Sequence, residues 1–229
     1  MRHDECCSVE ISNTNWAGII ENLKVNAHTP PLYYFLLNLW IKLFGTGEAA
    51  VRSLSAVFFI FSLFAIYVLG KTLFDKKAGL LGAFLCMVSP LTIQHAQDAR
   101  MYSLLALLGT LSTLFFIRLF FLKTVKTRDF FLYIIFNVAG TFTHYWFFFV
   151  LLSQSAAYFL LFPRAASKKF FLGGFLSALP FFALWTPVLL MQLANGGTSW
   201  MDKPGPGALL STLLIFFGGG KQGLLVYAA

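Results

Sequence analysis

The chain has 229 residues, of which 58% are hydrophobic and 11% are charged, whereas a soluble domain of this size carries about 25% charged residues. Apolar runs near or above about 18 residues recur without the alternation of a transmembrane barrel, which excludes a soluble β-protein and predicts an all-α, polytopic membrane protein. The net charge of +8 also occurs in nucleic-acid-binding proteins, but in a membrane protein it more often reflects basic cytoplasmic loops. We therefore expect membrane lipids, and no nucleic acid, around this chain.

Residues 1–49 are expected to form a surface loop with juxtamembrane helices and an acidic pair, Asp4–Glu5, in front of a transmembrane domain over residues 50–229. Asn15 is a good N-cap, so we predict that an amphipathic helix follows it. The apolar residues of that helix recur at helical spacing: Trp16, Ile19, Ile20 and Leu23.

A second surface helix is predicted at 30–45, PPLYYFLLNLWIKLFG, which is apolar but short for a span at about 15 residues. Thr29 is the expected N-cap, with Pro30 in the first turn. The helix has two faces, a stripe with Tyr34, Asn38 and Lys42 and an apolar side with Leu32, Phe35, Leu36, Leu39 and Leu43. That pattern is typical of a helix lying in the membrane interface.

Seven transmembrane helices are predicted from the longer apolar runs. They are expected at about 51–70, 78–94, 101–121, 130–144, 146–163, 170–193 and from 208 onward. The run from 130 to 163 is too long for one span and contains THYW, so we interpret it as two short helices joined by a tight turn at His144.

The connections then alternate between two sides whose charges differ. One side holds eleven basic and two acidic residues, and the other holds six basic and seven acidic residues. The basic side is predicted to be cytoplasmic. The chain is therefore expected in the cytoplasmic (inner) membrane as a multi-pass protein, with residues 1–49 on the periplasmic or extracellular face.

The chemically capable side chains fall on that outer face, among them Asp4, Glu5, Asp98, Arg100 and all four histidines. The middles of the spans contain no Asp, Glu, Lys or Arg, which weakens a coupled-transporter interpretation. Simpler interpretations exist: Asp98 and Arg100 could form a loop salt bridge, and Tyr33, Tyr34 and Trp40 fit an aromatic belt. The histidines show no close metal-ligand spacing.

Several motifs occur in a characteristic order: HDECCSVEI, HTPPLYYFLLNLWIKLFG, EAAVRSLSA, GKTLFDKKAGLLGA, SPLTIQHAQDARMYSLL and THYWFF. In this order and spacing the chain resembles the GT-C superfamily of membrane glycosyltransferases. The similarity is greatest to the bacterial relatives of protein O-mannosyltransferases and to the transferases that attach aminoarabinose to lipid A. Family members begin with one more helix and continue for several hundred residues, so the sequence is expected to be a fragment truncated at both ends.

The resemblance implies transfer of a sugar from a polyprenyl-phosphate donor to an acceptor hydroxyl at the outer membrane face, with inversion. It implies that Asp4 is the general base, that Glu5 assists or orients it, and that Asp98 completes the catalytic set. Arg100, His28 and Lys24 are implied to bind the donor phosphate. Further residues are expected to line the site, namely Tyr33, Tyr34, His95, Tyr102, His144 and Tyr145.

No cofactor is required by this scheme, although a divalent metal ion bridging the phosphate stays open, because carboxylates suit such ions. The expected partners are the lipid-linked donor and a lipid, glycan or protein acceptor. Two alternatives also stay open. One is a flippase or transporter for lipid-linked sugars, for which scattered polar residues such as Asn137, Gln154 and Gln192 would form the path. The other is a non-catalytic membrane scaffold.

Overall fold

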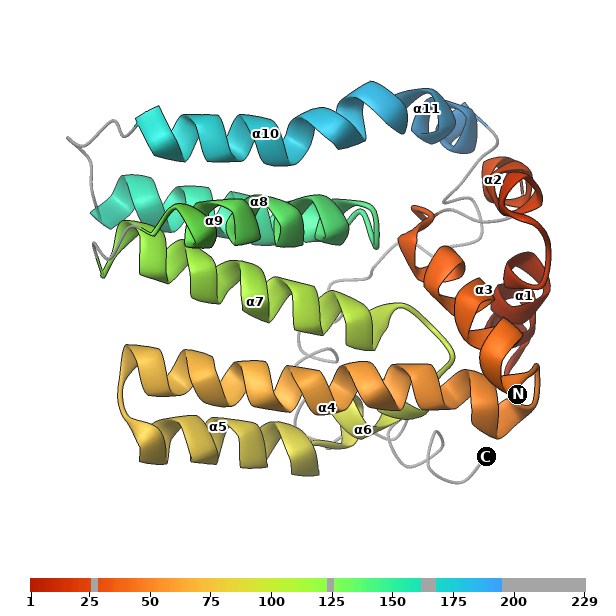
Figure 1. Ribbon diagram of the computed structural model, residues 1–229, viewed down its shortest axis with the longest axis horizontal. Coiled ribbons are helices and arrows are strands. Elements are labelled where there is room, and N and C mark those ends of the chain that lie inside the picture. The colour runs from red at the N-terminus through yellow and green to blue at the C-terminus, as the bar shows by residue number, and fades with distance from the viewer. Residues whose placement is uncertain (26–28, 123–125, 162–167, 195–229) are drawn as a thin grey trace, which may run out of the picture.

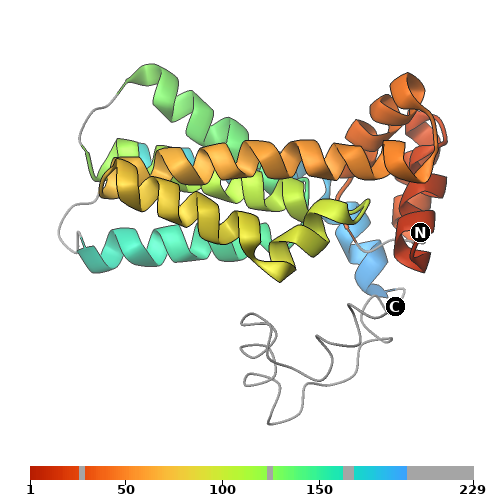
Figure 2. The ribbon, with the colours of Figure 1, turned by 90° about the horizontal axis from the view of Figure 1, so that it is seen from below.

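The computed structural model describes residues 1–25, 29–122, 126–161 and 168–194, and every regular element in these ranges is a helix. Three short helices come first: α1 (His3–Ser12), α2 (Trp16–Val25) and α3 (Leu32–Phe44). Figures 1 and 2 show these three helices gathered at one end of a bundle of longer helices. They form a cap, as the sequence predicts for the first 45 residues.

The bundle follows in chain order. It consists of α4 (Glu48–Leu73), α5 (Lys76–Val88), α6 (Pro90–Gln97), α7 (Tyr102–Phe120), α8 (Thr127–Thr141), α9 (Phe147–Leu161), α10 (Lys168–Leu184) and α11 (Thr186–Ala194). Helices α4 and α5 pack very closely, since a Cβ on Gly79 would come within 2.5 Å of the Tyr67 carbonyl oxygen. In Figure 1 the helices run back and forth, so the 98–101 loop and the 142–146 turn lie at the cap end.

The start of α4 lies at the cap end too, and its basic C-terminus lies at the other. The described basic segments at 71–77, 118–122 and 126–128 also lie at that far end (Figure 1). Among the residues that the structure describes, the connections that the sequence assigns to opposite sides therefore lie at opposite ends of the bundle.

Two helices are long and apolar enough to cross a membrane by themselves, α4 and α7, in agreement with the spans predicted at 51–70 and 101–121. The span predicted at 78–94 is instead a bent pair, because Pro90 begins a new helix and α5 and α6 meet at 65°. Residues 170–193 are bent by 58° between α10 and α11. The described residues thus contain two to four candidate spans; the predicted total of seven is not confirmed, and the span expected from 208 lies outside the described ranges.

The surface helices are where they were predicted, with one wrong cap and one unexpected orientation. Asn15 does cap α2, because its Oδ1 accepts the Gly18 N–H at 2.7 Å. The residue at the N-cap of α3 is Pro31, not Thr29, whose hydroxyl lies 3.0 Å from that of Tyr34. Asn38, on the polar stripe of α3, faces the protein and donates to carbonyl oxygens of the α1–α2 connection.

The apolar side of α3 is the side that solvent or lipid can reach, because Leu39 and Leu43 are exposed. Of the polar stripe, Tyr34 and Asn38 are turned inward while Lys42 is exposed. The placement of this helix in the membrane interface stays a prediction. The buried side of α3, with Tyr33, Leu37 and Ile41, packs in one core with residues of α4 and α7. This core attaches the cap to the bundle.

The turn at His144 is confirmed. Helix α8 ends at Thr141 and α9 begins at Phe147, whose ring packs against Gly140 so closely that no Cβ would fit there. The turn between α8 and α9 lies at the cap end of the bundle (Figure 1).

Between the helices of the bundle lies a buried network of neutral polar side chains. Ser112 of α7 donates to Asn137 of α8 and accepts a 2.8 Å bond from Gln154 of α9. Asn137 donates to Ser177 of α10, and Tyr133 donates to Gln154. These side chains satisfy one another across four helices, so their role is to hold the bundle together.

Candidate active site

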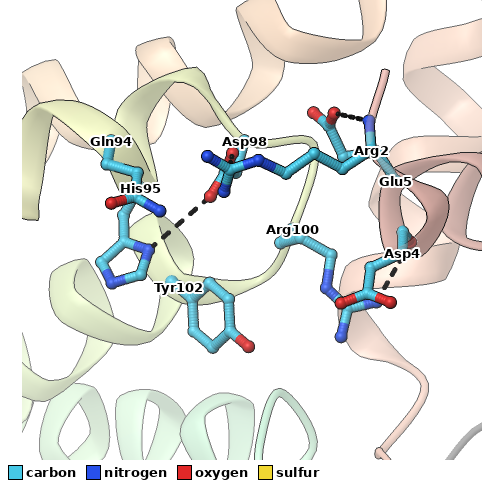
Figure 3. Close-up of a pocket in the computed structure, with 8 residues that line it drawn as sticks. All are labelled: Arg2, Asp4, Glu5, Gln94, His95, Asp98, Arg100 and Tyr102. Carbon is cyan, nitrogen blue, oxygen red and sulfur yellow. Dashed lines mark hydrogen bonds and ion pairs between the residues drawn. The ribbon is translucent and has the colours of Figure 1, made fainter. Parts of the chain in front are cut away.

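A pocket of about 230 Å³ lies where the N-terminus of α1 meets the loop that follows α6. Its wall is shown in Figure 3 and consists of Arg2, Asp4, Glu5, Gln94, His95, Asp98, Arg100 and Tyr102. The structure thus brings together the acidic pair of the first loop and the Asp98–Arg100 pair of the second, which are remote in sequence.

The carboxylate of Glu5 is buried, with 1% of the residue exposed. Arg52 of α4 binds it through two nitrogens, at 2.9 and 2.7 Å. It also accepts the backbone N–H of Ala99 at 2.8 Å and that of Arg2 at 2.7 Å. Glu5 therefore joins three segments that lie up to 94 residues apart in the chain.

These contacts fix the charge of Glu5. Burial alone would raise the pKa of this carboxyl, but the hydrogen bonds from Arg52, Ala99 and Arg2 outweigh it and lower the pKa to about 2. Every oxygen of the carboxylate is engaged by these donors. Glu5 is consequently a fixed anion that organises the site and is unsuited to accept a proton.

Asp4 is adjacent in sequence but differs in every one of these respects. Its side chain is 76% exposed, and the ion pair it makes is with His3, 3.9 Å from Nδ1 to Oδ1. Successive residues of an α-helix point about 100° apart, so Glu5 turns into the protein while Asp4 faces the pocket (Figure 3). Of the acidic pair, Asp4 is the carboxylate that a bound molecule can reach.

Asp98 ends α6 and lies on the other side of the pocket with 12% of its side chain exposed. Burial raises the pKa of Asp98, although the positive charge of Arg2 acts in the opposite direction. The Arg2 guanidinium lies 3.5 Å from the carboxylate, and His95 Nδ1 lies 4.0 Å from it.

Arg100 reaches from the same loop toward α1. Its Nη1 donates to the Asp4 carbonyl oxygen at 3.3 Å and to the Ser8 hydroxyl at 3.1 Å, while its Nε is buried without a hydrogen-bond partner. The loop itself is held in place, because the Ser55 hydroxyl of α4 donates to the Arg100 carbonyl oxygen. Arg100 also lines the pocket, so its planar guanidinium is placed to bind an anion there.

Aromatic rings form the remaining wall. Tyr102, at the start of α7, has the His95 ring 4.7 Å away and the His144 ring 6.3 Å away, centroid to centroid. His144 does not line the pocket itself, and its Nδ1 accepts the Trp146 backbone N–H. Sugar rings commonly bind against aromatic side chains because C–H groups pack on π faces.

Other residues expected in the site lie elsewhere. Tyr33 and Tyr34 are buried in the cores beneath α3. Tyr145 accepts the Trp185 indole N–H and bonds with Gln192. Lys24 pairs with Glu21 at 2.7 Å and does not line the pocket, and His28 lies outside the described residues.

Three residues at the site were not singled out from the sequence: Arg2, Arg52 and Gln94. Arg2 stands three residues before Glu5, a spacing at which neighbours on a helix meet, so its place near the acidic pair could have been predicted. Arg52 occurs in the EAAVRSLSA motif, but nothing in that motif identifies Glu5 as its partner.

Within the described ranges, no three His, Cys, Asp or Glu side chains come together in a way that would hold a metal ion. The free thiols Cys6 and Cys7 lie on α1 beside the pocket without lining it.

Comparison with known families gives one match. The family model described as dolichyl-phosphate-mannose-protein mannosyltransferase matches residues 28–191. Asp98, Arg100 and Arg52 lie inside the matched region, and the acidic pair of α1 precedes it. Searches of curated proteins and of solved structures return no match.

Proposed function

Because the chain belongs to the dolichyl-phosphate-mannose-protein mannosyltransferase family and is thus an integral membrane glycosyltransferase of the GT-C kind, we propose that it transfers a sugar from a polyprenyl-phosphate donor to an acceptor hydroxyl. One observation carries the proposal. An exposed carboxylate, Asp4, and an incompletely paired guanidinium, that of Arg100, line the same pocket.

The chemistry needs those two groups. The Asp4 carboxylate takes the proton of the acceptor hydroxyl as its oxygen attacks the anomeric carbon. The bond between that carbon and the phosphate oxygen breaks, and polyprenyl phosphate departs with the bonding electrons. Arg100 stabilises the charge that grows on the phosphate. One displacement of this kind inverts the configuration at the anomeric carbon.

Glu5 takes no part in the proton transfer in this scheme. It positions Asp4 by fixing α1 against α4 and against the backbone of the second loop. Asp98, which shares the pocket, lies 3.5 Å from Arg2 and 4.0 Å from His95.

The pocket lies at the end of the bundle away from the basic loops. The positive-inside bias therefore supports a site on the outer face of the cytoplasmic membrane. A lipid-linked donor suits that position, because its phosphate would lie at the interface while its prenyl chain stays in the bilayer.

The test is the variant Asp4→Asn, assayed in membranes with polyprenyl-phosphate mannose, the sugar in the family description, as first donor. Transfer is expected to fall by about 10²–10⁴-fold, the usual contribution of a general base. Glu10→Gln is the matched control, since it removes another exposed acid of α1 outside the pocket. Undiminished transfer by Asp4→Asn at normal expression would refute the assigned base.

The structure gives no support to a flippase. Two of the neutral polar residues that a path would need, Asn137 and Gln154, are already hydrogen-bonded within the bundle. Both bond to Ser112, and Asn137 also donates to Ser177. The third, Gln192, donates to the Leu23 carbonyl oxygen and so ties α11 to α2.

A further inference from the structure

Two arginines cross between the same two segments in opposite directions. Arg2 of α1 extends to Asp98 of the loop, while Arg100 of the loop extends to the Asp4 carbonyl and Ser8 of α1. Figure 3 shows the two side chains with the pocket between them. The two arginines thus connect the segments at each side of the pocket, in addition to the hydrogen bond from the Ala99 N–H to Glu5.

The two connections differ in how firmly they hold. Arg100 lies 96 and 92 residues from its α1 partners in sequence yet forms two hydrogen bonds with them, which fix its position. The contact of Arg2 is a single approach of 3.5 Å, with half of the arginine side chain exposed. At 3.5 Å the guanidinium lies beyond the usual length of a charge-assisted hydrogen bond, so its contact with the largely buried Asp98 carboxylate is weak. Arg2 can therefore leave Asp98 at small cost.

From this asymmetry we infer that Arg2 is a second phosphate-binding residue, which exchanges its Asp98 partner for the phosphate of an isoprenyl-phosphate ligand. The inference rests on the proposed function and assigns to Arg2 a role that the sequence did not suggest. A phosphate offers several strong acceptors to the planar guanidinium, whereas Asp98 is contacted through one nitrogen only. Arg2 and Arg100 then hold the phosphate from two sides of the pocket.

Asp98 acquires a defined role in this arrangement. In the absence of ligand its carboxylate contacts Arg2, and it therefore competes with an incoming phosphate for that guanidinium. Removing the carboxylate should strengthen phosphate binding, and this gain should require Arg2. That dependence separates an exchange of partners from a general change of charge in the pocket, because a general change would persist without Arg2.

The experiment is a double-mutant cycle of binding. Farnesyl phosphate is titrated into the detergent-solubilised chain, its Arg2→Gln and Asp98→Asn variants and the double variant, with farnesol as the ligand lacking phosphate. Arg2→Gln is expected to weaken binding about tenfold, and Asp98→Asn to strengthen it about threefold only when Arg2 is present. Lys42→Gln is the control, because it removes an exposed cation of the same cap outside the pocket.

Two results would overturn the inference: Arg2→Gln binding like the parent chain, or a gain from Asp98→Asn that persists in the Arg2→Gln background. Equal, Arg2-dependent binding of inorganic phosphate would leave the role of Arg2 intact and overturn the lipid as the source of the phosphate. An intact cycle in a chain that forms no glycosidic product with any polyprenyl-phosphate sugar would count against the proposed function alone. Arg2→Lys adds a check, since a point charge should recover only part of the affinity.

Discussion

The molecule contains two clusters of polar side chains, one in the pocket under the cap and one between helices α7 to α10. The inner cluster is neutral and closed, with Ser112, Asn137, Gln154 and Ser177 bonded to one another. The outer cluster is charged and open, with the exposed carboxylate of Asp4 and the guanidinium of Arg100 lining the same pocket. Closed networks fix a structure, whereas capacity left unused is available to a ligand.

Glu5 shows that the outer cluster contains a closed part of its own, and breaking it should have the largest effect. Arg52→Met leaves the buried Glu5 carboxylate without its main partner, which should cost about 3–5 kcal/mol of stability. Lys71→Met, an exposed change at the far end of the same helix, is expected to be neutral. Thermal unfolding of the purified variants in detergent gives the comparison.

A second change decides whether that loss is due to the isolated charge. Glu5→Gln introduced into Arg52→Met should recover part of the stability, because the uncompensated charge is gone. If the double variant is less stable than Arg52→Met, the explanation by charge fails.

The pH dependence of stability should separate Glu5 from its neighbours. The folded-state pKa of Glu5 is lowered to about 2, so its stabilising effect is complete above about pH 4.5 and is lost as the pH falls toward 2. The linked free energy is about 3 kcal/mol. Apparent melting temperatures between pH 3 and 7 should fall below pH 4.5 in the parent chain and fall less in Glu5→Gln. Equal slopes in both would contradict this assignment.

Substitutions in the inner network should have the smallest effect, and they should change only the stability of the protein. Asn137→Leu removes one member and leaves Ser112 and Ser177 to find other partners, for a loss of about 1–2 kcal/mol. The rate of sugar transfer per folded molecule should be unchanged. If a substrate had to move along a path through Asn137, the substitution would lower that rate as well. The measurement pairs unfolding in detergent with the transferase assay.

The sequence predicted those parts of the fold that depend on local signals. Run length identified α4 and α7, the cap at Asn15 identified the start of α2, and the THYW turn separated α8 from α9. Thr29 was assigned as a cap on local preference, but a tertiary contact with Tyr34 uses its hydroxyl instead. Pro90 could have signalled the break after α5, since proline commonly begins a helix.

From the sequence it could be predicted which charged residues come together in the candidate site, but not which role each of them has. The order of motifs suggested that Asp4, Glu5, Asp98 and Arg100 act together, and they line one pocket. Whether Glu5 or Asp4 faces that pocket depends on Arg52 and Ala99, which lie 47 and 94 residues away from Glu5. No local pattern could reveal contacts over such separations.

The order of the two acids in α1 determines how far each carboxylate reaches, because their side chains differ in length. Aspartate is one methylene shorter than glutamate, about 1.5 Å. The inner position must span the gap to a guanidinium on α4 and a peptide nitrogen of the second loop at once. Written in reverse, as Glu then Asp, the same pair would leave the inner carboxylate short of both donors and push the outer one further into the pocket. The order Asp then Glu therefore matters because the buried carboxylate needs the longer side chain.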